Sequence, residues 1–120
     1  MVGVGPFIPH EQTPLRNDEK GDFWLALKVM ALTRINLPDI NIPATTAMET
    51  LNPNGRIIAL QSGANVVMPN VTSTEYRAKY EIYPGKICIN DKPGQCRECI
   101  EAKIKSVGRT ISKGYGSCKK

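Results

Sequence analysis

The sequence lacks the features that mark several broad protein classes. No apolar run among its 120 residues approaches the roughly 18 residues of a membrane span. The N-terminus, MVGVGPFIPH, has neither the basic start nor the length of a secretory signal. No glycine-rich phosphate loop of the Walker type is present. We therefore expect a cytoplasmic protein without a membrane partner, and in that reducing compartment clustered cysteines more often bind metal or do redox chemistry than form structural disulfides.

Histidine is scarce, and positive charge is confined to one end of the chain. His10 is the only histidine, and no acidic or serine partner at a recognisable spacing supports a catalytic triad. The net charge of +5 arises after residue 100, where six Lys or Arg residues stand against Glu101 alone. Tyr115 is the only aromatic residue there, so base stacking has little support. We interpret residues 109–120 as a basic, disordered tail and do not expect a nucleic-acid partner; RNA binding is the weakest alternative.

Short apolar runs alternate with helical patterns along the rest of the chain. Runs typical of buried strands lie at residues 1–7, 42–46 and 64–68. Helices are expected at residues 23–35 (capped by Asp22), 55–61 (ended at Gly63), 73–82 (with a Thr72–Glu75 capping box) and 98–107 (closed by Gly108). This order predicts an α/β fold with a parallel sheet: a partial (β/α)8 TIM-type barrel of about three β/α units, plus a C-terminal cysteine loop and helix.

Three parallel strands are too few to stand alone. They leave two unpaired edges, and a (β/α)8 barrel typically takes about 250 residues. The chain also starts directly on an apolar run. We therefore expect a C-terminal fragment of a larger barrel, in which Met1 is an internal methionine.

Four separate motifs carry a family resemblance over residues 1–108. They are MVGVGPFIPHEQTPL, IPATTAMETL, SGANVVMPNVTSTEYRAKYEIYPGKIC and a C-x7-C-x2-C spacing. In this order they resemble the last third of a radical SAM enzyme of the biotin synthase-related family. The HydE-like maturases of FeFe hydrogenase resemble the chain most, and biotin synthase-like and methylornithine synthase-like proteins are related alternatives. The resemblance implies that residues 1–108 are the C-terminal portion of a radical SAM barrel.

The resemblance implies a chemistry that this chain cannot perform alone. HydE-like proteins reductively cleave S-adenosylmethionine (SAM) to a 5′-deoxyadenosyl radical during assembly of the hydrogenase active site. Their 4Fe-4S cluster sits on a C-x3-C-x2-C motif, which this sequence lacks. The resemblance therefore implies SAM and a 4Fe-4S cluster in the complete protein and an inactive fragment. The implied partners are the missing N-terminal barrel half and the hydrogenase maturation proteins.

The carboxyl ends of the expected strands are the candidate ligand-binding positions, because parallel barrels bind ligands there. Thr45 and Thr46 are present either because threonine favours strands or because, together with exposed backbone amides, they form an anion-binding site. The resemblance places this pair at a substrate or anion pocket. Met68 either fills the hydrophobic core or contacts a ligand. Tyr80 and Tyr83 are three residues apart on the following helix and share one face. The resemblance implies that the cofactor-binding residues are Met1, Gly3, Phe7, Ile8, Met68, Tyr80 and Tyr83.

Three cysteines within residues 88–99 form the remaining candidate site. The C-x2-C of Cys96 and Cys99 places two thiolates on one turn, and Pro93-Gly94 folds Cys88 back toward them. Three thiolates are one short of the usual four, and Cys118 is a candidate fourth ligand. Free thiols are the alternative. In some HydE-like proteins the same spacing holds an accessory 2Fe-2S cluster, so we predict a peripheral 2Fe-2S or zinc site. The competing function is a small, non-catalytic iron-sulfur or zinc binding module.

Overall fold

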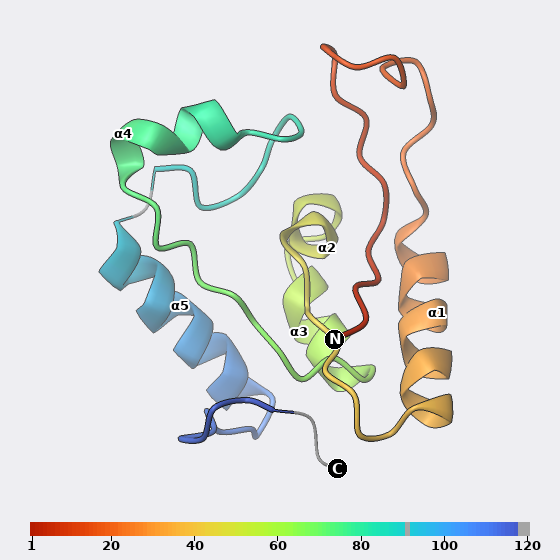
Figure 1. Cartoon of the computed structure of the whole chain (residues 1–120), viewed down its shortest axis with the longest axis vertical. Helices are drawn as coiled ribbons and strands as arrows, with labels where there is room; N and C mark the ends of the chain where they lie inside the picture. Colours follow the sequence, from red (N-terminus) through yellow and green to blue (C-terminus); the bar gives the residue numbers. More distant parts are fainter. Residues whose placement is uncertain (91, 118–120) are drawn as a thin grey trace.

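Helices joined by long extended segments make up the chain (Figure 1). The computed structural model describes residues 1–90 and 92–117. The helices are α1 (Phe23–Asn36), α2 (Thr46–Leu51), α3 (Gly55–Gln61), α4 (Thr74–Arg77), the 3-10 helix η1 (Ala78–Tyr80) and α5 (Pro93–Ser106). None of these described helices has the length and hydrophobicity needed to cross a membrane.

The three predicted strands are extended segments that run side by side without forming β-strands in the described chain. The amide of Val2 donates to the carbonyl of Asn41 at 2.8 Å, and the amide of Ala44 donates to Val66 at 2.8 Å. An isolated parallel bridge joins Pro43 to Val66. The predicted parallel direction is therefore confirmed for the second and third segments. The described residues do not show the predicted (β/α)8 barrel.

Two local features keep the second segment from continuing as a strand. Pro43 has no N–H to donate to a ladder. Thr45 then caps α2, its hydroxyl accepting the amide of Met48 at 3.4 Å, so Thr46 opens a helix instead of ending a strand. The prediction of a strand over residues 42–46 is wrong because this cap is formed.

The predicted helices are confirmed where cap residues are clear. The Asp22 carboxylate accepts the amide of Leu25 at 2.5 Å at the start of α1. Helix α3 spans the predicted residues 55–61, and Gly63 has a φ of +122° after its end. Helix α5 begins at Pro93 rather than at residue 98, because proline is well suited to the first helical position.

The predicted helix over residues 73–82 differs most from the helix that the structure shows. It is divided into α4 and η1 and ends at Tyr80. The Thr72–Glu75 capping box is wrong, since the N-cap is Ser73 and its side chain makes no cap hydrogen bond. The carbonyl of Thr72 instead accepts the guanidinium of Arg77 at 2.7 Å. A tertiary contact thus replaces the local cap.

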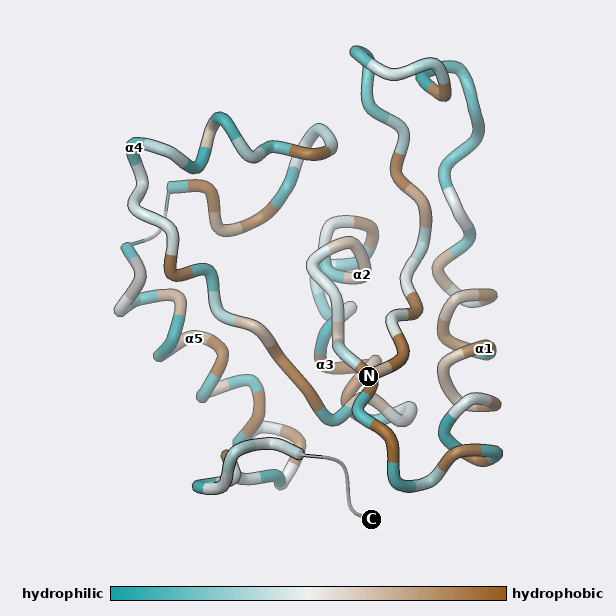
Figure 2. The backbone as a smooth tube through the Cα atoms, in the orientation of Figure 1, coloured by the Kyte–Doolittle hydropathy of each residue, from teal (hydrophilic) through white to brown (hydrophobic). Residues whose placement is uncertain are grey.

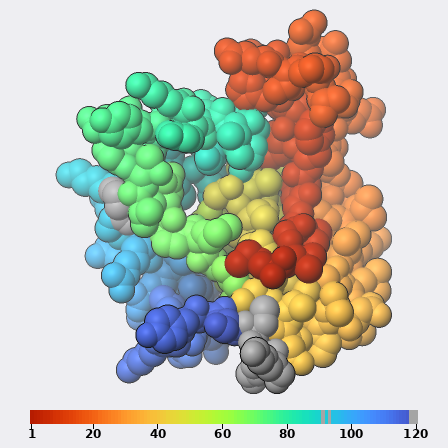
Figure 3. All heavy atoms as spheres, viewed as in Figure 1, coloured from red at the N-terminus to blue at the C-terminus, as the bar shows by residue number. Residues whose placement is uncertain are grey.

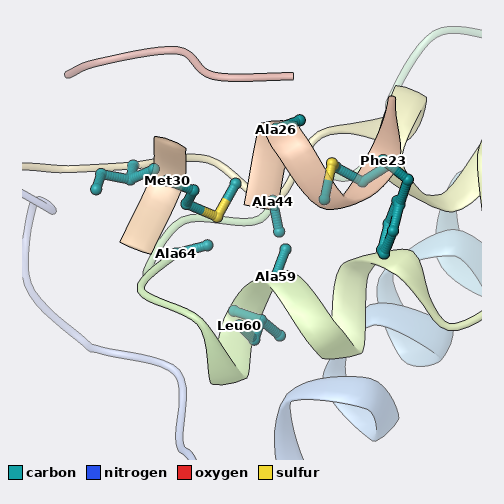
Figure 4. Packing of buried hydrophobic residues seen from close by; sticks show 9 residues of the cluster. Phe23, Ala26, Met30, Ala44, Ala59, Leu60 and Ala64 are labelled. Atoms are coloured by element: carbon teal, nitrogen blue, oxygen red, sulfur yellow. The ribbon is translucent and has the colours of Figure 1, made fainter. Parts of the chain in front are cut away.

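The core lies between α1, α3 and the two central extended segments (Figure 4). Phe23 and Met30 of α1 lie across it from Ala59 and Leu60 of α3. Small side chains let the helices approach the extended segments closely, and Met30, Ile42 and Met48 are fully buried. Hydrophobic residues also line the extended segments and α1 in Figure 2. The exposed large hydrophobic side chains of α1 are Trp24, Leu25, Val29, Leu32 and Ile35.

The first residues of the predicted tail contact the body of the chain. Arg109 donates from Nη1 to the carbonyl of Ala64 at 2.7 Å, and the Asn41 side chain donates to the carbonyl of Gly116 at 2.7 Å. Gly108 has a φ of +72° just after α5. Residues 118–120 lie outside the described chain. The division into residues 1–108 and 109–120 stays a prediction.

Candidate functional site

A cavity of about 290 Å³ lies between the end of the third extended segment, α4 with η1, and the start of α5. In Figure 3 the third extended segment (green) and the N-terminal segment (red) lie on either side of the yellow atoms of α2. Five predicted site residues line this cavity: Thr46, Met68, Tyr80, Cys88 and Cys96. The other lining residues are Arg56, Pro69, Asn70, Thr72, Arg77, Lys86, Ile87 and Ile89. The structure therefore brings together the ends of two of the three extended segments and part of the cysteine loop.

The two predicted threonines have different surroundings. The hydroxyl of Thr46 is 2.7 Å from the hydroxyl of Tyr83, which is buried, and either group can donate. Thr45 does not line the cavity; it caps α2 and packs beside Gly5, where an added Cβ would lie 2.9 Å from its Oγ1. Of the pair, Thr46 is thus the residue that lines the cavity, and its hydroxyl is paired with that of Tyr83.

The predicted N-terminal cofactor residues lie away from this cavity. Met1, Gly3 and Phe7 are exposed, Ile8 is buried, and none of them lines it. The carbonyl of Phe7 accepts the amide of Gly21 at 2.8 Å, which ties the segment to the start of α1. Their roles in cofactor binding stay predictions.

Arg77 organises the walls of the cavity. Its side chain is buried, at 3% relative exposure. It donates to the carbonyls of Thr72 at 2.7 Å, Asn70 at 3.0 Å and Cys88 at 2.7 Å. One guanidinium thereby joins the loop after the third extended segment to the cysteine loop. The sequence analysis missed this residue, because hydrogen bonds to backbone carbonyls leave no pattern in side-chain types.

A buried charge cluster joins α2, α3 and α5 beside the cavity. The Nε of Arg56 is 3.2 Å from Oε2 of Glu49, and the Nζ of Lys103 pairs with Oε1 of the same carboxylate. Arg56 and Glu49 are 3% and 7% exposed. Burial lowers the pKa of Lys103 from its ordinary value, and the adjacent carboxylate favours its charged form. The sequence analysis did not identify this cluster, since its members lie on three different helices.

The three cysteines that the structure describes are not gathered around one metal position. Cys96 is buried, and its sulfur accepts the amide of Asn70 at 3.4 Å, whereas Cys99 is exposed. Cys88 is half-buried with a φ of +61°, and Cys118 lies outside the described residues. No three His, Cys, Asp or Glu side chains within residues 1–90 and 92–117 are placed to hold one metal ion. The described residues therefore hold no assembled metal site, and the cysteine site stays a prediction.

We predict that anaerobic reconstitution loads metal onto the cysteine loop and that this loading depends on the C-x2-C pair. Wild-type chain is expected to retain iron with sulfide, or zinc, after desalting. A Cys96→Ser/Cys99→Ser variant should lose most of it, because two thiolates on one turn are removed. Iron, sulfide and zinc analysis provides the measurement. Equal metal content in the two proteins would show that these cysteines are not a metal site.

The lining of the cavity combines apolar and polar side chains. The exposed side chains of Met68 and Tyr80 give it apolar surface, and the Thr46 hydroxyl gives it a polar group. Its volume of about 290 Å³ is just below the range of about 300–1,000 Å³ typical of ligand pockets. A 4Fe-4S cluster of the radical SAM type does not fit this chain, because the C-x3-C-x2-C ligands are absent from its sequence.

The chain is similar to a hydrogenase maturase over its whole length and to two synthases over part of it. It is 56% identical over 120 residues, 100% of the chain, to the [FeFe] hydrogenase maturase subunit HydE of Thermotoga maritima, and covers 34% of that protein. The 3-methylornithine synthases of Methanosarcina acetivorans and Methanosarcina barkeri are 33% and 32% identical over 84 residues, which is 68% of the chain and 23% of each synthase. No protein-family model matches the chain. The chain thus spans about a third of the length of the maturase that it matches.

Proposed function

We propose that this chain is the C-terminal part of the barrel of a HydE-like radical SAM protein. The proposal rests on the likeness of the whole chain to a HydE maturase, which confirms the resemblance expected from its motifs. The complete protein would reductively cleave SAM to a 5′-deoxyadenosyl radical in assembly of the FeFe-hydrogenase active site. The observation that carries the proposal is the identity of 56% over all 120 residues. The matches to 3-methylornithine synthases support the broader radical SAM relationship.

Within that protein, this chain would shape a ligand pocket rather than supply the reactive iron. The 4Fe-4S cluster, on a motif that this chain lacks, would supply the electron for SAM cleavage. Met68 and Tyr80 would present apolar surface to the ligand, and Tyr83 would orient the hydroxyl of Thr46. The positions of Thr46, Met68 and Tyr80 in the lining of one cavity support this assignment.

The rest of the barrel would be the first partner of this chain. Several large hydrophobic side chains of α1 are exposed, among them Trp24, Leu32 and Ile35. Exposed apolar side chains on one helix are consistent with further protein packing there. Hydrogenase maturation proteins would be the partners of the complete protein, and a cytoplasmic location stays a prediction.

A 3-methylornithine synthase-like protein is the second candidate. Two such relatives match the chain at 33% and 32% identity. They cover 68% of the chain, whereas the maturase matches all of it at 56%. The maturase-like function is therefore the one that we favour.

We test the proposal by replacing the matching third of the Thermotoga maritima maturase with this chain. The purified chimera, reconstituted anaerobically and incubated with SAM and dithionite, is expected to form 5′-deoxyadenosine, because the pocket and the cluster motif are then in one protein. The isolated chain should form none above a protein-free control. A folded, cluster-loaded chimera that forms no 5′-deoxyadenosine while the parent maturase does would contradict the proposal, and so would turnover by the isolated chain.

A further inference from the structure

We propose that a second cavity binds a phosphate group, either that of a small phosphate ester or free phosphate. Its volume of about 530 Å³ lies within the range of about 300–1,000 Å³ typical of ligand pockets. Asn41 and Asn65 line it and precede the bridge between the extended segments, whereas Thr46 and Met68 of the first cavity follow that bridge. The two cavities share no described lining residue. The proposal goes beyond SAM cleavage and depends only on the geometry of this chain.

Two arginines from distant parts of the chain line this second cavity, and backbone carbonyls hold both in place. The Nε of Arg34, near the end of α1, donates to the carbonyl of Gly63 at 2.9 Å. The Nη1 of Arg109, after α5, donates to the next carbonyl, that of Ala64, at 2.7 Å. The Nη1 of Arg34 also donates to three carbonyls within residues 37–40, the shortest bond being 2.6 Å. Two positive charges are thereby fixed at one cavity.

Neither arginine has a carboxylate partner among the residues that the structure describes. Asp39 is the one acidic residue of the described lining; it is exposed and forms no ion pair with either guanidinium. The described lining therefore carries two positive charges and one negative charge. Neutral carbonyls orient a guanidinium without cancelling its charge. An anion in this cavity would therefore gain charge-assisted hydrogen bonds, which are stronger than neutral ones.

Both guanidiniums keep N–H groups without an acceptor in the described chain. The Nη2 of Arg34 is enclosed and unpaired, which is costly for a polar group. The side chain of Arg109 is exposed and donates only through Nη1, so its Nη2 is available to a ligand. The planar N–H groups of a guanidinium match the geometry of phosphate oxygens. We assign the direct contact with the phosphate to Arg109 and the adjoining positive charge to Arg34.

Two asparagine side chains add oriented neutral donors to the lining. The Oδ1 of Asn65 accepts the amide of Ile42 at 2.8 Å, and the Oδ1 of Asn41 accepts the Nδ2 of Asn65 at 3.2 Å. The Nδ2 of Asn41 donates to the carbonyl of Gly116 at 2.7 Å. Each Nδ2 carries two N–H groups and uses one of them in these bonds. The remaining N–H groups are further donors for the oxygens of a phosphate or of its ester group.

The test uses the complete 120-residue chain. Sodium glycerol 3-phosphate or inorganic phosphate is titrated at constant ionic strength, balanced with chloride, while Tm and the side-chain Nε–H resonances of Arg34 and Arg109 are followed. We expect saturable stabilisation by at least one probe, as mass action requires for a ligand of the folded state, with shifts of both resonances. Tighter binding of glycerol 3-phosphate would identify an ester as the ligand, and equal or tighter binding of inorganic phosphate would identify the free ion; both results support the site.

Arg109→Gln should weaken binding of the probe about tenfold or more, as expected when a hydrogen bond to a charged group is lost. Arg97→Gln is the matched control, because Arg97 is exposed on α5 and does not line the cavity. This control should change the dissociation constant by less than about twofold, since an exposed charge outside the site contributes little.

Asp39→Asn should move the dissociation constant in the opposite direction, which loss of structure would not do. Removing this carboxylate should tighten binding about twofold to threefold, because a negative charge near the phosphate is lost. Asp18→Asn is its control, since Asp18 is exposed and does not line the cavity. Saturable binding that is weakened by Arg109→Gln or tightened by Asp39→Asn, relative to the controls, supports the site. Absence of saturable binding by both probes, or no difference between the cavity variants and their controls, overturns it. Failure of the chimera to cleave SAM would not alter this readout.

Discussion

Replacing Gly55 by alanine is expected to lower the free energy of unfolding by about 3 kcal/mol or more, because an added methyl group has no space at the start of α3. The new Cβ would lie 2.0 Å from the carbonyl oxygen of Met48 and 2.3 Å from its carbonyl carbon. These are backbone atoms of α2, so no side-chain rotation relieves the overlap. Helices α2 and α3 would have to separate, which would disturb the packing of the fully buried Met48 side chain. Urea unfolding followed by circular dichroism measures the loss.

Gly94→Ala is the matched control for this prediction. Gly94 lies in α5, and an added Cβ there meets no atom within 4 Å. Alanine is the better helix former by about 1 kcal/mol, so this variant should be as stable as wild type or slightly more stable. If the two glycine variants unfold at the same urea concentration, α2 and α3 are not in close contact at Gly55.

Replacing Glu49 by glutamine is expected to cost about 3–5 kcal/mol of unfolding free energy, as when one partner of a buried ion pair is removed. Glutamine keeps the shape of the side chain but removes the charge that Arg56 and Lys103 share. Arg56 is 3% exposed and cannot regain water without moving α3. A fall in Tm of more than about 10 °C follows if each kcal/mol shifts Tm by several degrees.

Glu98→Gln is the control, since Glu98 is exposed on α5 and a surface change of this kind usually stays within about 0.5 kcal/mol. The two variants remove the same charge, so their difference isolates the buried cluster. Equal stability of Glu49→Gln and Glu98→Gln would contradict the prediction that the buried charge cluster stabilises the fold.

The sequence by itself determined the elements whose signals are local. The side chain of Asp22 reaches the amide of Leu25 within one turn, so the start of α1 follows from neighbouring residues. The left-handed position of Gly63 likewise follows from its place after α3. The family resemblance was also in the sequence, as the 56% identity to the maturase confirms.

Tertiary structure decided how far the extended segments pair and which charged side chains meet. Apolar runs that read as buried strands form strands only where partner segments satisfy their backbone groups over several residues, and the described chain provides one parallel bridge. Arg56, Glu49 and Lys103 come from three helices, and Arg77 binds carbonyls up to 11 residues away. Such pairings depend on how helices pack around the buried Met48 and Ile42. Contacts between elements leave no periodic pattern in the sequence. The polar residues that line the cavity could therefore be identified only from the folded structure.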